Sequence, residues 1–240
     1  MAVTGAQGLE ALGAVAASTE RFADSVRSLS EAQAQGPTLI PPWTRGHVVT
    51  HVARAADSYR RLLTGAIDGV EAPQYPSMAF RAEQIENGAR RSVSDLVADV
   101  VDSSALFDRM MRTLPEHAWE ARVRMRPGEL RPPAALPLIR LRELEVHHVD
   151  LDVGYGFGDI APDVAQWIID DILMELGRRA EPPPVRIEAT DTGLRRELGR
   201  GASLISGAQV DLLAWLSGRS PGTGLKTEST GAPPDAPYWI

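Results

Sequence analysis

The chain has 240 residues, of which 43% are hydrophobic and 24% are charged, so it has the composition of a globular protein with one large core or two small ones. Its net charge of −7 argues against nucleic acid as a partner, because nucleic-acid binding requires a clustered basic surface. The absence of cysteine excludes disulfides, thiolate metal sites and a cysteine nucleophile, so any metal must be bound by His, Asp or Glu.

The sequence predicts neither a membrane span nor a secretion signal. It contains no apolar run of the roughly eighteen residues that a membrane helix needs. Its N-terminal segment lacks the basic start of a signal peptide and carries Glu10 within the apolar part. We therefore expect a cytoplasmic protein that does not bind membranes.

Helices are predicted from the N-terminus onward. Over residues 9–29 the apolar positions recur every three or four residues, which is typical of an amphipathic helix. The prolines at 41–42 interrupt this pattern. A second helix is predicted over residues 44–64, with Thr44 as its N-cap and Gly65 just past its end.

The middle of the chain predicts two more bundle helices. A third helical region spans about residues 78–114, and we expect a break near Ser92. Residues 116–133 are rich in Pro and Arg and predict a long loop or a short hairpin. A fourth helix is predicted over about 134–153 and ends at the GYGFG segment, residues 154–158.

The C-terminal part of the chain has a mixed pattern. Residues 162–179 predict a helix, VRIEAT at 185–190 and ASLISG at 202–207 predict strands, and AQVDLLAWLSG at 208–218 predicts a helix capped by its final glycine. The tail over 220–240 is expected to be extended.

These elements predict a mainly α protein in two domains. Residues 1–155 are expected to form an antiparallel four-helix bundle, because four helices of this length are joined by modest connections. Residues 156–240 are expected to form a small C-terminal α+β domain.

The histidines carry the clearest chemical signal, since four of the five lie on two predicted bundle helices. GHVVTH places His47 and His51 at the spacing of the H-E-x-x-H zinc helix, but Val48 stands where that motif has glutamate. RLRELEVHHVDLD places Glu143 and His147 one turn apart on one helix face. Facing bundle helices commonly build metal sites, so these pairs predict a site with two histidines, one carboxylate and an open coordination position.

Two further residues flank this pattern. His148 is rotated by about 100° from its neighbour, so the same helix cannot easily aim both histidines at one ion. Asp150 lies one turn beyond His147 and is suited to accept the second N–H of that imidazole. The residues alone leave open which of His47 and His51 belongs to the site.

Two stretches resemble the DinB-like metalloenzyme superfamily. PPWTRGHVVTHVARAADSYRRLLTG resembles the start of the second helix of that bundle, in which the ligand histidine follows a tryptophan by eight residues, so counting from Trp43 implies His51. RLRELEVHHVDLDVGYG resembles the fourth helix of the mycothiol-dependent maleylpyruvate isomerase branch, which implies Glu143 and His147 as the other ligands. On this basis His47 is expected to be a neighbour of the site or a surface residue.

The same family resemblance extends to the C-terminus. QVDLLAWLSGR is similar to the end of the family's small α/β domain, whose arginine after the last helix lines the active-site cleft, and this implies a catalytic and cofactor-binding role for Arg219. Arg81 is a second candidate for binding the thiol or the substrate, because both are expected to need fixed cations.

The resemblance implies a zinc enzyme that uses mycothiol to isomerise maleylpyruvate to fumarylpyruvate, with a small-molecule substrate and a low-molecular-weight thiol as its partners. The thiol would add reversibly to the activated double bond and so permit rotation. Two alternatives stay open: a mycothiol S-transferase acting on an electrophilic toxin or biosynthetic intermediate, and a non-enzymatic bundle that binds a ligand or a regulatory partner. A monomer or a small homo-oligomer is expected.

Overall fold

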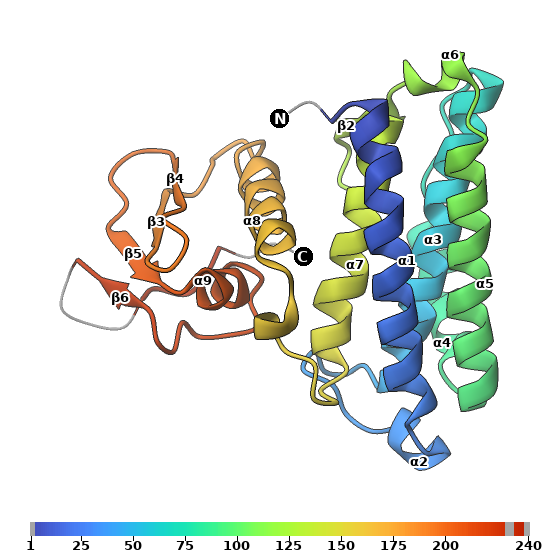
Figure 1. Ribbon diagram of the computed structural model, residues 1–240, viewed down its shortest axis with the longest axis horizontal. Helices are drawn as coiled ribbons and strands as arrows, with labels where there is room; N and C mark the ends of the chain where they lie inside the picture. Colours follow the sequence, from blue (N-terminus) through green and yellow to red (C-terminus); the bar gives the residue numbers. More distant parts are fainter. Residues whose placement is uncertain (1–2, 229–232, 238–240) are drawn as a thin grey trace. The chain divides into compact units, whose positions relative to one another are not determined.

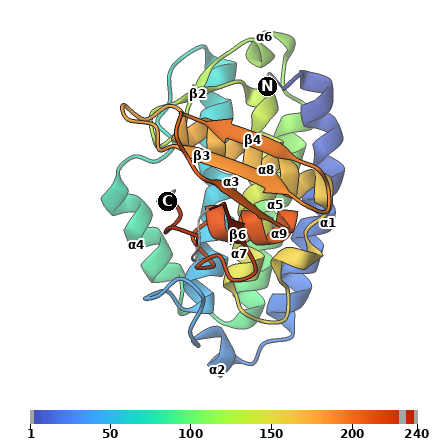
Figure 2. The same cartoon turned by 90° about the vertical axis from the view of Figure 1, so that its left-hand side faces the viewer.

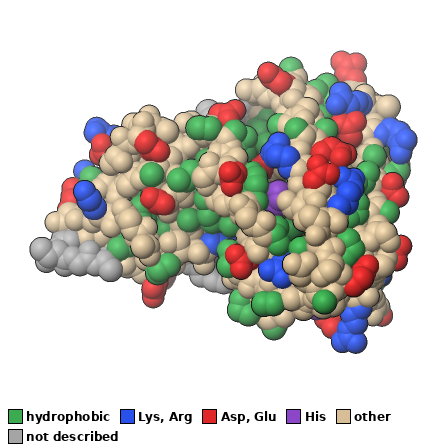
Figure 3. All heavy atoms as spheres, turned by 60° about the horizontal axis from the view of Figure 1, so that its bottom comes forward, with side chains coloured by type: hydrophobic (Ala, Val, Ile, Leu, Met, Phe, Trp, Pro, Cys, Tyr) green, Lys and Arg blue, Asp and Glu red, His purple; other side chains and the backbone are tan. Residues whose placement is uncertain are grey.

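The computed structural model describes residues 3–228 and 233–237. The chain divides into two compact units, Met1–Gly154 and Tyr155–Ile240. Among the described residues, no helix is both long enough and apolar enough to cross a membrane. Acidic and basic side chains are interspersed on the face of the molecule shown in Figure 3.

The first unit is a four-helix bundle, as predicted from the helical periodicity (Figure 1). In it, α1 packs against α5 and α7, and α3 packs against the same two helices. Shorter helices occupy the connections. The bundle helices are α1 (Gly5–Arg27), α3 (Arg45–Asp68), α5 (Val93–Arg112) and α7 (Leu136–Asp150), and the short helices are α2 (Glu31–Ala34), α4 (Met78–Gly88) and α6 (Glu116–Trp119).

The four bundle helices run two in each direction (Figure 1). Helices α3 and α5 are parallel because α4 returns the chain between them, and both are antiparallel to α1 and α7. The return is close: Gly46 near the start of α3 faces Ala89 at the end of α4, and a Cβ on this glycine would collide with the Ala89 carbonyl oxygen. A glycine is therefore required where the two backbones meet.

Helix α3 extends four residues further than the sequence predicted. The predicted end at Gly65 is wrong, because this glycine lies inside the helix, where a Cβ would come 2.7 Å from the Cβ of Ala72 in the returning chain. The helix ends instead at Gly69, whose φ of 69° is the left-handed conformation common at helix C-termini. The predicted break near Ser92 is confirmed, because the Ser92 hydroxyl accepts a hydrogen bond from the Asp95 amide and caps α5.

Residues 116–133 were predicted to form either a long loop or a short hairpin, and the structure has the hairpin. After α6, strands β1 (Val123–Arg124) and β2 (Leu130–Arg131) pair antiparallel. A 3₁₀ turn, η1 (Pro133–Ala135), then leads into α7. Residues on every side of α7 are buried, so this helix is the most enclosed of the four.

The second unit is the predicted small α+β domain. Its sheet has the order β4-β3-β5-β6, with β3 and β5 parallel and the outer pairs antiparallel. Helix α9 packs on α8 and on strands β3 and β5 (Figure 2). The elements are η2 (Phe157–Asp159), α8 (Pro162–Leu176), β3 (Val185–Ala189), β4 (Arg195–Leu198), β5 (Leu204–Gly207), α9 (Gln209–Leu216) and β6 (Lys226–Thr227).

Two strands of this sheet were not predicted. Strand β4 has the sequence RREL and lies at the edge of the sheet, so it lacks the apolar alternation by which a strand is recognised. Strand β6 has only two residues and falls in the tail that was expected to be extended. Residues 229–232 and 238–240 of that tail lie outside the described residues.

Candidate metal centre

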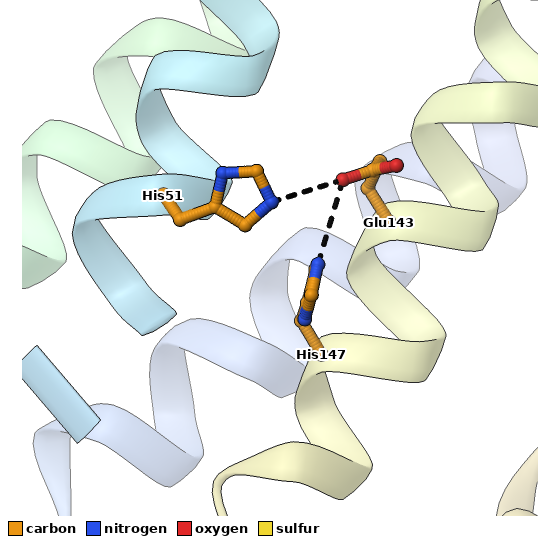
Figure 4. A group of neighbouring side chains, drawn as sticks. All are labelled: His51, Glu143 and His147. Atoms are coloured by element: carbon orange, nitrogen blue, oxygen red, sulfur yellow. Dashed lines mark ion pairs between the residues drawn. The ribbon is translucent and has the colours of Figure 1, made fainter. Parts of the chain in front are cut away.

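The three predicted ligands meet inside the bundle (Figure 4). His51 projects from the second turn of α3, and Glu143 and His147 project from the middle and the last part of α7. Because α3 and α7 are packed against each other, the i,i+4 pair on α7 faces the single histidine on α3.

The geometry suits a divalent metal. Glu143 Oε2 lies 3.3 Å from His51 Nε2 and 3.5 Å from His147 Nε2. One ligand atom from each residue can be chosen so that all three lie within 4.8 Å of one another. Both histidines are buried, and the Glu143 side chain is 11% exposed. Two imidazole nitrogens and one carboxylate oxygen form the donor set of a catalytic zinc site with an open position.

Asp150 fixes the orientation of His147. Its Oδ2 lies 2.8 Å from His147 Nδ1, and the Asp150 side chain is fully buried. The predicted contact is therefore present. A carboxylate on Nδ1 places the ring proton there and leaves the Nε2 lone pair available for a metal, which is the usual outer partner of a metal-binding histidine.

His51 has a different environment. Arg81, on α4, places its Nη2 3.2 Å from His51 Nδ1, and its guanidinium lies 5.9 Å from the ring centre of Trp43. The Trp43 and His51 rings are 5.3 Å apart. Because a guanidinium can only donate hydrogen bonds, Nδ1 accepts and Nε2 carries the proton directed at Glu143. A metal bound through Nε2 would take the place of that proton.

The ionisation of the three side chains also suits a cation. Burial lowers the pKa of His51 to about 4, so this imidazole is neutral at pH 7. Burial alone would raise the pKa of Glu143, but hydrogen bonds from His147 and His51 hold it well below its usual range. For His147, burial alone would lower the pKa, but hydrogen bonds to Asp150 and Glu143 raise it above its usual value. The carboxylate is therefore ionised at neutral pH and ready to bind a positive charge.

Two of the three other histidines have structural roles. His47 lies at the start of α3, where its Nδ1 accepts a hydrogen bond from the Thr44 amide and its Nε2 contacts Glu86 at 3.1 Å. His148 is buried, and its Nε2 lies 2.8 Å from the Ser25 hydroxyl. The sequence left His47 and His51 as alternatives before the family resemblance, and only His51 faces the pair on α7.

Sequence reasoning missed two residues beside the site. Arg140 on α7 is fully buried, and its guanidinium donates to the Val52 carbonyl at 2.5 Å and the Ser104 hydroxyl at 2.9 Å. Burial lowers its pKa to about 10. Tyr75 lies in the chain between α3 and α4, with its ring centre 5.7 Å from the Arg81 guanidinium. Arg140 opens the RLRELEVHHVDLD stretch, but nothing in that pattern distinguishes it from an exposed helix arginine, and Tyr75 belongs to no motif.

The predicted arginine of the second unit follows α9. Arg219 Nη1 donates to the Ser217 carbonyl at 2.6 Å, and its backbone amide donates to the Ala214 carbonyl. The glycine before it, Gly218, has a φ of 75°, as expected for a helix C-terminus. A role for Arg219 in binding substrate or thiol stays a prediction.

Comparisons with known proteins agree with this description. Residues 15–152 match the family called mycothiol maleylpyruvate isomerase N-terminal domain, and residues 159–237 match the MDMPI C-terminal domain family. A crystal structure of the mycothiol-dependent maleylpyruvate isomerase is similar at 25% identity and a TM-score of 0.87, over 96% of each chain. A histidine-to-alanine mutant of that enzyme is similar at 25% identity and a TM-score of 0.86, also over 96% of each chain. No curated protein sequence matches the chain.

Proposed function

Because the chain belongs to the mycothiol maleylpyruvate isomerase family, we propose that it is a zinc enzyme that uses mycothiol to isomerise maleylpyruvate to fumarylpyruvate. The observation that carries this proposal is the convergence of His51, Glu143 and His147, from two packed helices, within 4.8 Å. The donor set fits zinc, because it combines two imidazoles and an ionised carboxylate and leaves room for a further ligand.

The three side chains would hold the metal through His51 Nε2, His147 Nε2 and a Glu143 oxygen. When bound, the metal supplies a positive charge that deprotonates a thiol at neutral pH and holds the sulfur in place. Asp150 keeps the His147 ring oriented by accepting the Nδ1 proton. The chain contains no cysteine, so none of its own side chains competes as a thiolate for the open position.

We propose that Arg81 binds a carboxylate of the substrate or a polar group of the thiol. Its guanidinium already lies beside His51 and within 6 Å of the ring centres of Trp43 and Tyr75, so the planar group is held close to the site. A guanidinium in this position offers a fork of donors that matches a carboxylate. Arg219 of the second unit is proposed for the same task from the family resemblance.

The test is a metal and activity assay on one preparation. We expect the purified protein to contain about one zinc per chain and to isomerise maleylpyruvate only when mycothiol is present. His51→Ala should lose both properties, because it removes one of three ligands. His47→Ala is the matched control: it changes a histidine one turn away on the same helix and should keep the zinc.

Two outcomes would change this conclusion. Zinc absent from the native protein, or retained equally by His51→Ala, would refute the assignment of the metal centre. Zinc present without isomerase activity would leave the centre in place and favour the transfer of mycothiol to an electrophile.

A further inference from the structure

A cavity lies in the first unit, beside α3. It has a volume of about 490 Å³, within the range of small-molecule sites, and is lined by α3, the chain that leads to α4, and the start of α4. The helix α4 that borders it is seen at the side of the bundle in Figure 2. None of the three proposed metal ligands lines this cavity.

The cavity is connected with the metal centre through contacts. Tyr75 lines it, the Arg81 guanidinium lies over the Tyr75 ring, and Arg81 reaches His51. Ser58 on α3 also lines the cavity, seven residues after His51. Seven residues are close to two helical turns, so both side chains point to similar sides of α3, about 10 Å apart along its axis. A molecule with one end at the metal and a body of this length would reach the cavity.

The charges of the lining argue against a dicarboxylate as the occupant. The lining contains three arginines and two aspartates. Two of the arginines are already paired, since Arg54 and Arg60 each lie 3.1 Å from an Asp57 carboxylate oxygen. Arg61 leaves one cation for a first carboxylate, but a second carboxylate would have to break these ion pairs or lie close to an aspartate.

The same lining suits a neutral group with many hydroxyls. The Gln74 amide is held in place, because its Nε2 donates to the Ser58 hydroxyl and its Oε1 accepts from the Arg126 amide. In the described part of the chain, the side chains of Arg61 and Gln84 have no hydrogen-bond or ion-pair partner, so their donors and acceptors are available. Amides, guanidinium groups and carboxylates together pair with hydroxyls that both donate and accept. Tyr75 and Phe80 add aromatic faces for the carbon skeleton of such a ligand.

We propose that this cavity binds the polyhydroxylated head group of the mycothiol cofactor and thereby directs its thiol toward the metal centre. The proposal rests on the proposed function, because it names where the thiol of that reaction is held. It predicts that the affinity for the thiol and the affinity for maleylpyruvate depend on different residues of the first unit.

The test fills the cavity without touching the metal centre. Thr64 lines the cavity, is exposed, and makes one side-chain hydrogen bond, to the Arg60 carbonyl one turn back. Thr64→Trp would place an indole in the space proposed for the head group. Thr113 is the matched control, because it is exposed near the end of α5, bonds the Arg109 carbonyl in the same way, and lies outside the cavity.

Binding is measured by calorimetry on the zinc-loaded protein with S-methyl mycothiol, whose blocked sulfur cannot form a thiolate. We expect Thr64→Trp to weaken this binding, and to raise the KM for mycothiol, by about tenfold or more. The KM for maleylpyruvate, the zinc content and the unfolding temperature should stay as in the unmodified protein, and Thr113→Trp should leave every quantity unchanged. Gln84→Ala, which removes donors without adding bulk, should weaken the same binding by a smaller factor.

Several results would overturn the proposal. Equal binding of S-methyl mycothiol by Thr64→Trp would remove the cavity from the thiol site, and a rise in the KM for maleylpyruvate alone would assign it to the substrate. If the unmodified protein neither bound nor used mycothiol, the proposed function would fail and this inference with it. Normal use of mycothiol by both the unmodified protein and Thr64→Trp would refute the inference alone.

Discussion

Asp150 offers the sharpest test of how the proposed metal centre is organised. Its carboxylate is fully buried and accepts the Nδ1 proton of His147 at 2.8 Å. Asp150→Asn retains the shape and an oxygen that can accept the same proton, but it removes the negative charge. Asp150→Ala removes both the charge and the acceptor. Neither change alters a proposed metal ligand, so any effect on zinc must act through the orientation and basicity of His147.

The expected loss of zinc affinity follows from the burial of the contact between Asp150 and His147. Loss of an outer partner of a metal-binding histidine typically costs about 10- to 100-fold in metal affinity, or about 1.4 to 2.7 kcal/mol. Neutral hydrogen bonds are roughly half as strong as charged ones, and water cannot replace the partner at a buried site. We therefore expect about tenfold weaker zinc binding for Asp150→Asn and about a hundredfold for Asp150→Ala.

The assay is competition for zinc with a chelator of known affinity, with circular dichroism to confirm that the variants are folded. Ser25→Ala is the matched control, because it removes a 2.8 Å contact with the adjacent histidine, His148, which lies outside the ligand set. We expect it to bind zinc as the unmodified protein does. Equal zinc affinity in all variants, or an equal loss in Ser25→Ala, would show that Asp150 does not position His147.

Three further predictions concern stability. Gly46→Ala should destabilise the bundle by about 2 kcal/mol or more, because the new Cβ collides with the Ala89 backbone. An unchanged midpoint of urea unfolding would contradict the close approach of α3 and α4. Ser92→Ala should cost about 1 kcal/mol in urea unfolding, since it removes the cap of α5, whereas Ser94→Ala in the first turn should cost much less. Removal of zinc by a chelator should lower the unfolding temperature in calorimetry, because a ligand present at 100 times its Kd stabilises the folded state by about 2.7 kcal/mol. The unfolding temperature of His51→Ala should not change when the chelator is added.

Much of the fold could be predicted because it depends on local periodicity. The four bundle helices follow from apolar residues at a spacing of three or four, and the break before α5 follows from the capping preference of Ser92. The errors occur where distant contacts override local signals. Gly65 has the local preference of a helix end, but it lies inside α3 because the returning chain at Ala72 packs against it. Strand β4 exists through pairing with β3 and has no apolar pattern of its own.

The candidate site likewise depends partly on local spacing and partly on contacts between distant segments. The sequence by itself determined that Glu143 and His147 share one face of a helix, because a spacing of four residues brings side chains together on any α-helix. It also placed Asp150 one turn further, within reach of His147. The family resemblance, carried by the distance from Trp43, singled out His51.

Only the tertiary structure decided what surrounds these residues. His47 and His51 are one turn apart on α3, and the local sequence does not distinguish between them. The packing of α3 against α7 brings His51 to Glu143, while His47 caps the helix start. The contact of Arg81 with His51 depends on the return of the chain through α4, and so does the cavity beside Tyr75. Local periodicity specifies which face of a helix a side chain occupies, whereas the partner of that face is chosen by contacts between segments far apart in the chain.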